Sequence, residues 1–300
     1  MDDRQHALAD LLKLLRRRGY AFVTPTPATH ARVVARRGVP GRDLRDTLGW
    51  SLPFEPGTAD PDVVALLNAA GAVEYAGEWL RATVRVSSRG ERLFLHSAYP
   101  TTGDDAVFFG PDSYRFADLI EREHRPARRV LDIGAGTGIG GIVAAAAGAE
   151  VILADPNPAA LWLAEVNAAD AGVAVTRVET AGCGDVDGRF DLIVINPPYI
   201  LDPGGPAYRS GGDLHGAALT VELAREGLER LAPGGRMIVY SGSAILDGRD
   251  RLRDALAALG GGFDFAYREL DPDVFGEELD GPGYAGVERI AAVAAIFDRR

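Results

Sequence analysis

The sequence predicts an α/β fold in which a doubly wound, seven-stranded sheet follows a smaller helical domain. Short apolar runs alternate with segments of helical periodicity after about residue 105. One of these runs, residues 130–133, leads into a glycine-rich turn and a helix, and another, residues 190–195, ends in Asn-Pro-Pro-Tyr. The 300 residues, 47% of them hydrophobic, are enough for a full α/β domain and a second, smaller one.

Residues 1–100 are predicted to form the smaller domain. Apolar residues at helical spacing predict helices over residues 6–18, 43–48 and 61–70. The alternating residues 79–86 and the segment 91–97, joined by a turn over 87–90, predict a β-hairpin. Helices followed by a two-stranded wing make this domain winged-helix-like.

Residues 101–300 are predicted to form the larger domain, in which strands alternate with helices. The expected strands are residues 130–133, 151–154, 173–178, 190–195, 236–240, 263–270 and 289–297. The expected helices are residues 114–122, 142–147, 158–171, 217–231 and 250–259. Asp112 or Ser113 is expected to cap the first of these helices. The last two strands are expected to pair antiparallel and close the sheet.

The glycine-rich turn after the first strand of the larger domain predicts a cofactor site. It contains Gly134, Gly136 and Gly138, and glycine lets the backbone approach a ligand closely. The next strand ends in Asp155, 21 residues after Gly134. An acid at that point typically holds the ribose hydroxyls of an adenosine-containing cofactor. The sequence therefore predicts a cofactor with an adenosine moiety.

The segment 136–141 also fits the Gly-x-Gly-x-x-Gly pattern of dinucleotide-binding proteins, so an NAD-dependent oxidoreductase is an alternative. Asp132 argues against it, because a carboxylate at this position repels a pyrophosphate but attracts the ammonium of a methionine moiety. Lys13 is the only lysine and lies outside this domain, so a Tyr-x-x-x-Lys proton relay has no lysine to use. A dinucleotide cofactor is therefore the less favoured alternative.

The tetrapeptide Asn196-Pro197-Pro198-Tyr199 directly follows the strand 190–195. Its two prolines fix the backbone and remove two N–H donors. The Asn196 side-chain oxygen and the Pro197 carbonyl can then accept both protons of a planar NH2 group, while Tyr199 stacks on its plane. Accepting both protons raises the electron density on a weakly nucleophilic nitrogen and stabilises the charge that develops on it. A plain strand-terminating turn is the alternative, because Asn-Pro and Pro-Pro are common in loops.

In their order and spacing, the glycine turn, Asp155 and the Asn-Pro-Pro-Tyr segment resemble the class I S-adenosylmethionine-dependent methyltransferases over residues 105–300. Within that class they look like the enzymes that methylate planar nitrogens, namely release-factor glutamine-amide methyltransferases and adenine-N6 methyltransferases of DNA and RNA. The resemblance implies a Rossmann-like sheet, S-adenosyl-L-methionine as cofactor, and Asn196, Pro197 and Tyr199 as catalytic residues. The cofactor-binding residues that it implies are Phe109, Asp132, Gly134, Gly136, Gly138, Asp155, Pro156, Ala181 and Asn196.

The chain also departs from the pattern of the release-factor enzymes. Ala181 stands where the family usually has an acid that accepts the adenine amino proton, so we expect either backbone contacts or an acid from Asp185 or Asp187 in its place. The N-terminal domain and the segment 110–113 also differ. In related enzymes an N-terminal domain binds substrate or forms a homodimer, and we expect one of these roles here. The glycine-rich segment 203–216 is similar to a stretch in the release-factor enzymes and is expected to cover the substrate as a lid.

Charge is unevenly distributed along the chain, whose formal net charge is −11. Residues 1–95 carry 14 basic and 11 acidic side chains, a net charge of +3, whereas residues 96–300 carry 18 and 32, a net charge of −14. Affinity for phosphate backbones depends on Lys and Arg, so the acidic larger domain disfavours nucleic acid as a partner. We expect a protein amide or a small molecule as methyl acceptor, with adenine-N6 of RNA or DNA as the alternative.

The sequence also carries predictions about location. The single cysteine, Cys183, excludes a disulfide framework and suits a reducing compartment. No secretory signal is expected, because the apolar segment 11–15 is short and interrupted by Lys13, and no apolar stretch approaches the roughly 20 residues that span a bilayer. We therefore expect a cytoplasmic protein that binds no membrane and holds no metal.

Overall fold

A computed structural model describes residues 1–57, 60–201 and 211–300, and the chain folds into two compact units. The first unit contains Met1–Arg115, Gly136–Ile139 and Asn157–Ala174, and the second contains Phe116–Ala135, Gly140–Pro156 and Val175–Arg300. Each unit has its own hydrophobic core. The units group residues by packing rather than by chain order, so the boundary near residue 100 stays a prediction.

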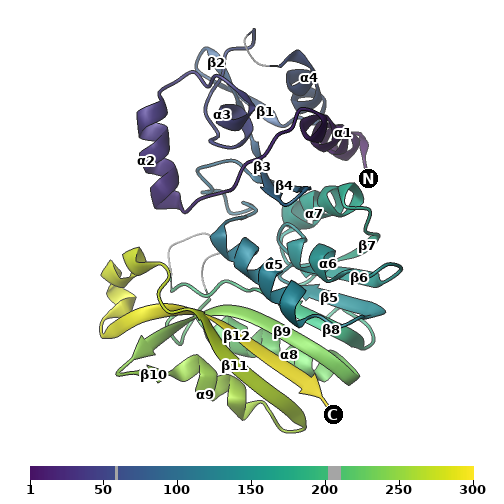
Figure 1. Cartoon of the computed structure of the whole chain (residues 1–300), viewed down its shortest axis with the longest axis vertical. Helices are drawn as coiled ribbons and strands as arrows, with labels where there is room; N and C mark the ends of the chain where they lie inside the picture. The colour runs from purple at the N-terminus through teal and green to yellow at the C-terminus, as the bar shows by residue number, and fades with distance from the viewer. Residues whose placement is uncertain (58–59, 202–210) are drawn as a thin grey trace. The chain divides into compact units, whose positions relative to one another are not determined.

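The first unit combines helices with two small antiparallel hairpins. Its helices are α1 (Asp3–Arg17), α2 (Pro27–Arg37), α3 (Leu44–Leu48), α4 (Pro61–Ala69) and α7 (Pro158–Asp170) (Figure 1). Its strands are β1 (Val73–Ala76), β2 (Trp79–Ala82), β3 (Val84–Arg89) and β4 (Arg92–Ser97), which pair as β1–β2 and β3–β4. A capping box starts α1, because the Asp2 carboxylate accepts from the Gln5 N–H and the Gln5 side chain accepts from the Asp2 N–H, both at 2.8 Å.

The predicted long strand over residues 79–86 is wrong, because the chain leaves the β-ladder at Thr83. The Thr83 N–H donates to the Ala72 carbonyl at 3.0 Å, and the Thr83 carbonyl accepts from the Ala98 N–H at 3.1 Å. β2 therefore pairs with β1, and β3 and β4 alone form the wing, with its turn at residues 90–91. The sequence analysis also missed α2 and β1.

Helix α7 packs into the first unit although it follows β6 in the chain. Val166 of α7 shares one buried core with Leu11 and Leu15 of α1. The Asn167 side chain accepts from the Leu95 N–H at 2.8 Å and donates to the Leu95 and Thr137 carbonyls, both at 3.0 Å. One fully buried asparagine thus joins α7, β4 and the glycine-rich turn.

The second unit is built on an eight-stranded sheet in the described part of the chain, in the order β11-β12-β9-β8-β5-β6-β7 with β10 paired to β9 (Figure 1). Its strands are β5 (Arg129–Ile133), β6 (Glu150–Asp155), β7 (Val175–Glu179), β8 (Phe190–Ile195), β9 (Leu231–Leu246), β10 (Arg249–Asp250), β11 (Phe263–Asp271) and β12 (Val287–Arg299). Pairing is parallel from β7 through β9, whereas β12 is antiparallel to both β9 and β11. The predicted α/β sheet and its closing antiparallel pair are confirmed.

Helices cover this sheet. They are α5 (Pro111–Glu123), α6 (Ile139–Ala144), α8 (Ala218–Arg230) and α9 (Arg251–Ala258), with short 3-10 turns η1 (Gly276–Asp280) and η2 (Pro282–Tyr284) before β12. Leu223 of α8 and Leu256 of α9 share a buried core with Ile195 and Met237 of the sheet. Among the residues placed by the structure, no helix combines the length and the apolar character needed to cross a membrane.

Several element boundaries differ from the sequence prediction. Helix α6 spans Ile139–Ala144 instead of residues 142–147. Helix α5 begins at Pro111, so Asp112 and Ser113 lie in its first turn rather than at its cap, and the Gly110 N–H donates to the Ser113 hydroxyl at 3.2 Å. Strand β9 extends from 231 to 246 instead of 236–240, because β12 pairs with it from Arg236 to Leu246. This long antiparallel partner is not visible from the local sequence around β9.

Candidate active site

Three adjacent strands of the second unit end at the same level. Ile133 of β5 pairs with Ala154 of β6 on one side and with Ile195 of β8 on the other. Gly134, Asp155 and Asn196 therefore leave the sheet side by side, with Asp155 and Asn196 separated by two strand spacings, roughly 10 Å. The strand order reverses between β5 and β8, and the carboxyl ends at such a switch point form the ligand crevice of doubly wound sheets.

The turn after β5 requires glycine because of its backbone conformation. Gly134, Gly136 and Gly138 have φ angles of +70°, +52° and +78°, which side chains with a Cβ rarely adopt. A Cβ built on Gly134 or Gly136 would meet no atom within 4 Å, so the turn borders open space. The N–H groups of Gly134 and Ala135 donate to the Ala154 carbonyl at 2.8 and 3.1 Å, which ties the start of the turn to β6. The result is a fixed turn beside space for a ligand.

Asp132 lies beneath this turn with only 1% of its surface exposed. Its Oδ2 accepts from the Gly141 N–H at 2.7 Å, and a Cβ on Gly140 would come within 2.7 Å of its carboxylate. Burial raises the pKa of Asp132 to about 8; the hydrogen bond from Gly141 opposes this rise, and the Asp155 charge adds to it. A bound ammonium group would favour the ionised form, so this carboxyl fits the methionine end of the expected cofactor.

Asp155 is the last residue of β6 and is buried, and its carbonyl accepts from the Thr180 N–H at 3.2 Å. Pro156, which follows it, is exposed, and Ala181 is exposed in the turn after β7. An acid near this turn comes from an element that the sequence analysis did not consider: Glu226 of α8 accepts from the Cys183 N–H at 2.9 Å. No local pattern marks Glu226, because it belongs to an ordinary amphipathic helix.

Asn196 and Pro197 begin the segment that leaves β8. Asn196 is half-buried, and its side chain makes no hydrogen bond with the described residues. The Pro197 carbonyl likewise accepts no backbone N–H within the described ranges. Asn196 and the buried Pro197 thus place two acceptors without a hydrogen-bond partner in the described residues at the carboxyl edge of the sheet, next to Gly134.

The Tyr199 ring is buried by aromatic neighbours and by a glycine. Its centroid lies 6.2 Å from that of Tyr240 and 6.0 Å from that of Phe275. A Cβ on Gly242 would collide with the ring, so only glycine at that position of β9 leaves room for it. The sequence analysis missed Gly242 and Phe275, because nothing in their own segments indicates a contact with residue 199. Stacking of Tyr199 on an acceptor stays a prediction.

The expected lid lies only partly within the described residues. Pro203 and Arg209 lie outside them, whereas residues 211–216 pack on the segment after β8. The Gly211 N–H donates to the Ile200 carbonyl at 2.9 Å, and a Cβ on Gly216 would collide with backbone atoms of Tyr199 and Ile200. The described end of this segment is therefore seated on the backbone that carries the two acceptors.

Phe109 belongs to the first unit, as do Gly136 and Gly138 of the glycine-rich turn. Phe109 is 1% exposed, and its ring centroid lies 5.4 Å from that of Phe94, 5.3 Å from that of His96 and 5.1 Å from that of Tyr114. Within this unit it is a core residue, and the predicted contact of Phe109 with a cofactor stays a prediction.

Comparisons with known proteins agree with this geometry. A family model described as the methyltransferase small domain matches residues 116–258. The release factor glutamine methyltransferase of Cereibacter sphaeroides is 30% identical over 268 residues, which cover 71% of this chain and 90% of that protein. The chain belongs to the class I S-adenosylmethionine-dependent methyltransferases. Its resemblance to the release factor glutamine methyltransferases, predicted from the motifs, is confirmed.

Further relatives differ in the extent of the match. The release factor glutamine methyltransferase of Deinococcus radiodurans is 37% identical, but the match covers 40% of this chain and 47% of that protein. The ribosomal protein L11 methyltransferase of Syntrophotalea carbinolica is 31% identical over 73% of this chain and 70% of that protein. Among solved structures, M. jannaschii TYW2 in complex with AdoMet superposes with a TM-score of 0.50 at 17% identity, covering 76% of this chain and 90% of that one, which shows a shared fold.

The activity class and the cofactor predicted from the sequence are confirmed: the protein is an S-adenosylmethionine-dependent N-methyltransferase. The glycine turn beside open space and the buried carboxyl of Asp132 fit this cofactor. An NAD-dependent oxidoreductase, the less favoured alternative, finds no support in the relatives.

Proposed function

We propose that this methyltransferase acts on the side-chain amide nitrogen of a glutamine in a protein acceptor. The observation that carries the proposal is the pair of available acceptors, the Asn196 side-chain oxygen and the Pro197 carbonyl, next to the glycine turn. An amide NH2 group presents two coplanar N–H donors, which matches two acceptors on one short segment. The relatives named release factor glutamine methyltransferases act on such a group, which supports this acceptor.

In the proposed reaction, S-adenosylmethionine supplies a methyl group whose bond to sulfur breaks as the nitrogen–carbon bond forms. Asn196 and Pro197 hold the nitrogen in line with the methyl carbon and accept hydrogen bonds from both of its N–H groups. These hydrogen bonds raise the electron density on the nitrogen, which makes its lone pair a better nucleophile. The buried Tyr199 ring supports the segment that carries both acceptors. The surplus proton on the methylated nitrogen leaves to solvent, so no strong base is required. We propose that Asp132 holds the ammonium and Asp155 the ribose hydroxyls of the cofactor.

The charge distribution favours a protein over a nucleic acid. The net charge of −14 on residues 96–300 disfavours a phosphate backbone at the face that carries Asn196. A small molecule with a planar NH2 group satisfies the same two acceptors, and we rank it second. We place the reaction in the cytosol, where the lone thiol of Cys183 stays reduced.

The test is transfer of labelled methyl from S-adenosylmethionine into purified bacterial release factor and, in parallel, into a cell lysate separated into protein, RNA and small molecules. We expect label in the release factor and in the protein fraction. Label confined to RNA would make the adenine-N6 activity the better assignment, and label confined to small molecules would remove the protein acceptor.

A further inference from the structure

Strand β9 continues beyond the end of the sheet that carries Asn196. Ile195 pairs with Val239, and β9 then runs on to Leu246 beside β12. At about 3.3 Å per residue, the residues 240–246 extend roughly 20 Å past the last parallel pair. We call this part of β9, with β10 and residues 287–293 of β12, the arm.

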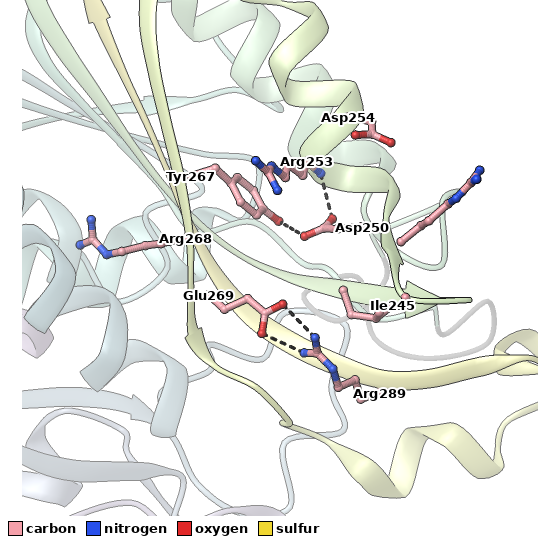
Figure 2. Close-up of a pocket in the computed structure, with 10 residues that line it drawn as sticks. Ile245, Asp250, Arg253, Asp254, Tyr267, Arg268, Glu269 and Arg289 are labelled. Atoms are coloured by element: carbon pink, nitrogen blue, oxygen red, sulfur yellow. Dashed lines mark hydrogen bonds and ion pairs between the residues drawn. The ribbon is translucent and has the colours of Figure 1, made fainter.

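A cavity of about 480 Å3 lies beside the arm, between the β9–β10 turn, the start of α9 and β11 (Figure 2). This volume is in the range of sites that hold small ligands or side chains of a partner. The β9–β10 turn is a tight two-residue hairpin, in which Asp247 and Gly248 both have positive φ angles, +49° and +69°. It fixes the backbone of Arg249 at the cavity.

Two acids of the cavity wall are already hydrogen-bonded within the protein. Asp250 accepts from the Tyr267 hydroxyl at 2.7 Å, the Ser243 hydroxyl at 2.6 Å and the Arg253 N–H at 2.9 Å. Glu269 forms a bidentate pair with Arg289, with distances of 3.0 and 2.9 Å (Figure 2). Both carboxylates are therefore poorly available to a cationic ligand.

In contrast to these two acids, the arginines of the turn and of α9 are available to a ligand. Arg249 and Arg253 are exposed, and neither side chain forms an ion pair with the described residues. Figure 2 shows the Arg253 guanidinium on the side of the cavity where Tyr267 lies. Asp254 is the one wall acid for which the described residues provide no partner. The charges available to a ligand are thus two positive and one negative.

We propose that this cavity binds a carboxylate-bearing segment of the protein acceptor while its amide occupies the site at Asn196. The inference rests on the proposed protein acceptor and adds a second recognition point to it. A separation of roughly 20 Å selects an acceptor of macromolecular size. A peptide carboxylate is favoured over polyphosphate, because Asp254 stands in the wall with the two available arginines and repels a densely charged polyphosphate more strongly than it repels separate carboxylates.

The test compares three proteins: wild type, the double variant R249E/R253E, and R251E. Arg251 is the matched control, because it is an exposed arginine of the same helix that does not line the cavity. The probes are a fluorescent hexaglutamate peptide and a fluorescent RNA oligonucleotide, followed by anisotropy. We expect the double variant to bind hexaglutamate about tenfold more weakly and R251E to bind like wild type. The double variant should also have about a tenfold higher KM for release factor.

The outcomes separate this inference from the proposed function. Equal hexaglutamate binding by all three proteins would overturn the cavity inference, whatever they methylate. Binding of RNA that is lost in the double variant would assign the cavity to phosphate instead. Wild type that transfers no methyl to release factor contradicts the proposed function, whereas the peptide measurement decides the cavity independently.

Discussion

Two asparagines, one in each unit, show how a structural amide differs from one that is available to a ligand. Asn167 in the first unit is 1% exposed and makes three hydrogen bonds, with the Leu95 N–H and the Leu95 and Thr137 carbonyls. Asn196 in the second unit is half-buried and makes none with the described residues. Among the described residues, only Trp50 Nε1 is a buried side-chain polar atom without a partner, so the Asn196 amide is open to solvent and can bind a ligand without breaking an internal hydrogen bond.

The same contrast extends to the groups around each asparagine. The first unit buries Arg85, yet its Nε donates to the Gly49 carbonyl at 2.6 Å and its terminal nitrogen lies 3.0 Å from His30 Nδ1. Burial and, to a smaller extent, the Arg85 charge together lower the pKa of His30 to about 4, so His30 stays neutral and can accept this bond. These polar residues of the first unit stabilise the fold, whereas we propose that Asn196 and its neighbours at the carboxyl edge of the second unit bind ligands.

The largest expected effect is on turnover. Asn196→Ala removes one of the two hydrogen-bond acceptors for the substrate amide. Loss of such a contact costs on the order of 10²-fold or more in kcat. The free energy of unfolding should change by no more than about 0.5 kcal/mol, because no internal bond is lost. Steady-state kinetics and urea unfolding check both parts. A variant with nearly normal turnover would make the Asn-Pro-Pro-Tyr segment a simple turn.

The opposite result is expected for Asn167→Ala. It leaves two carbonyls and one N–H without their partner in a buried position, which should lower the free energy of unfolding by about 3 kcal/mol. Asn68→Ala is the matched control, because Asn68 is exposed on α4 and donates only to the Val64 carbonyl of its own helix. If urea unfolding finds the two variants equally stable, the contrast between the asparagines is lost.

Asp155→Ala should act on cofactor affinity. Removing a charged acceptor of the ribose hydroxyls should weaken S-adenosylmethionine binding about tenfold or more, with a smaller effect on kcat at saturating cofactor. Glu222→Ala, which removes an exposed acid of α8, serves as the control and should bind normally. Calorimetric titration measures both. Unchanged affinity of Asp155→Ala would remove Asp155 from the cofactor site.

The smallest expected effect is the change in the free energy of unfolding per pH unit that Asp132 causes. Its folded pKa of about 8 is raised above the ordinary value near 4, so the folded protein holds this proton more tightly than the unfolded chain. This contribution to stability is complete at acid pH and is lost as pH rises towards 8, by on the order of 1 kcal/mol per pH unit. Asp132→Asn should lack this slope without cofactor. Unfolding curves of the two proteins that stay parallel from pH 5 to 8.5 would refute it.

Local patterns predicted the parts of the molecule that depend on neighbouring residues. The β5–turn–α6 unit, Asp155 at the end of β6 and Asn196 after β8 follow from apolar runs, glycines and prolines within a few residues of one another. The strand break at Thr83 could not be predicted, because it depends on bonds to Ala72 and Ala98. Gly242 and Phe275 beside Tyr199 were missed for the same reason: their roles arise only when distant segments pack together.

We propose that Asn196 and Pro197 hold an amide nitrogen for methylation. Tandem mass spectrometry of release factor, after incubation with S-adenosylmethionine and either wild type or Asn196→Ala, tests it most directly. We expect one methyl group on a glutamine side-chain nitrogen with wild type and almost none with the variant at equal times. A methyl group on any other atom, or equal yields from the two proteins, would contradict it.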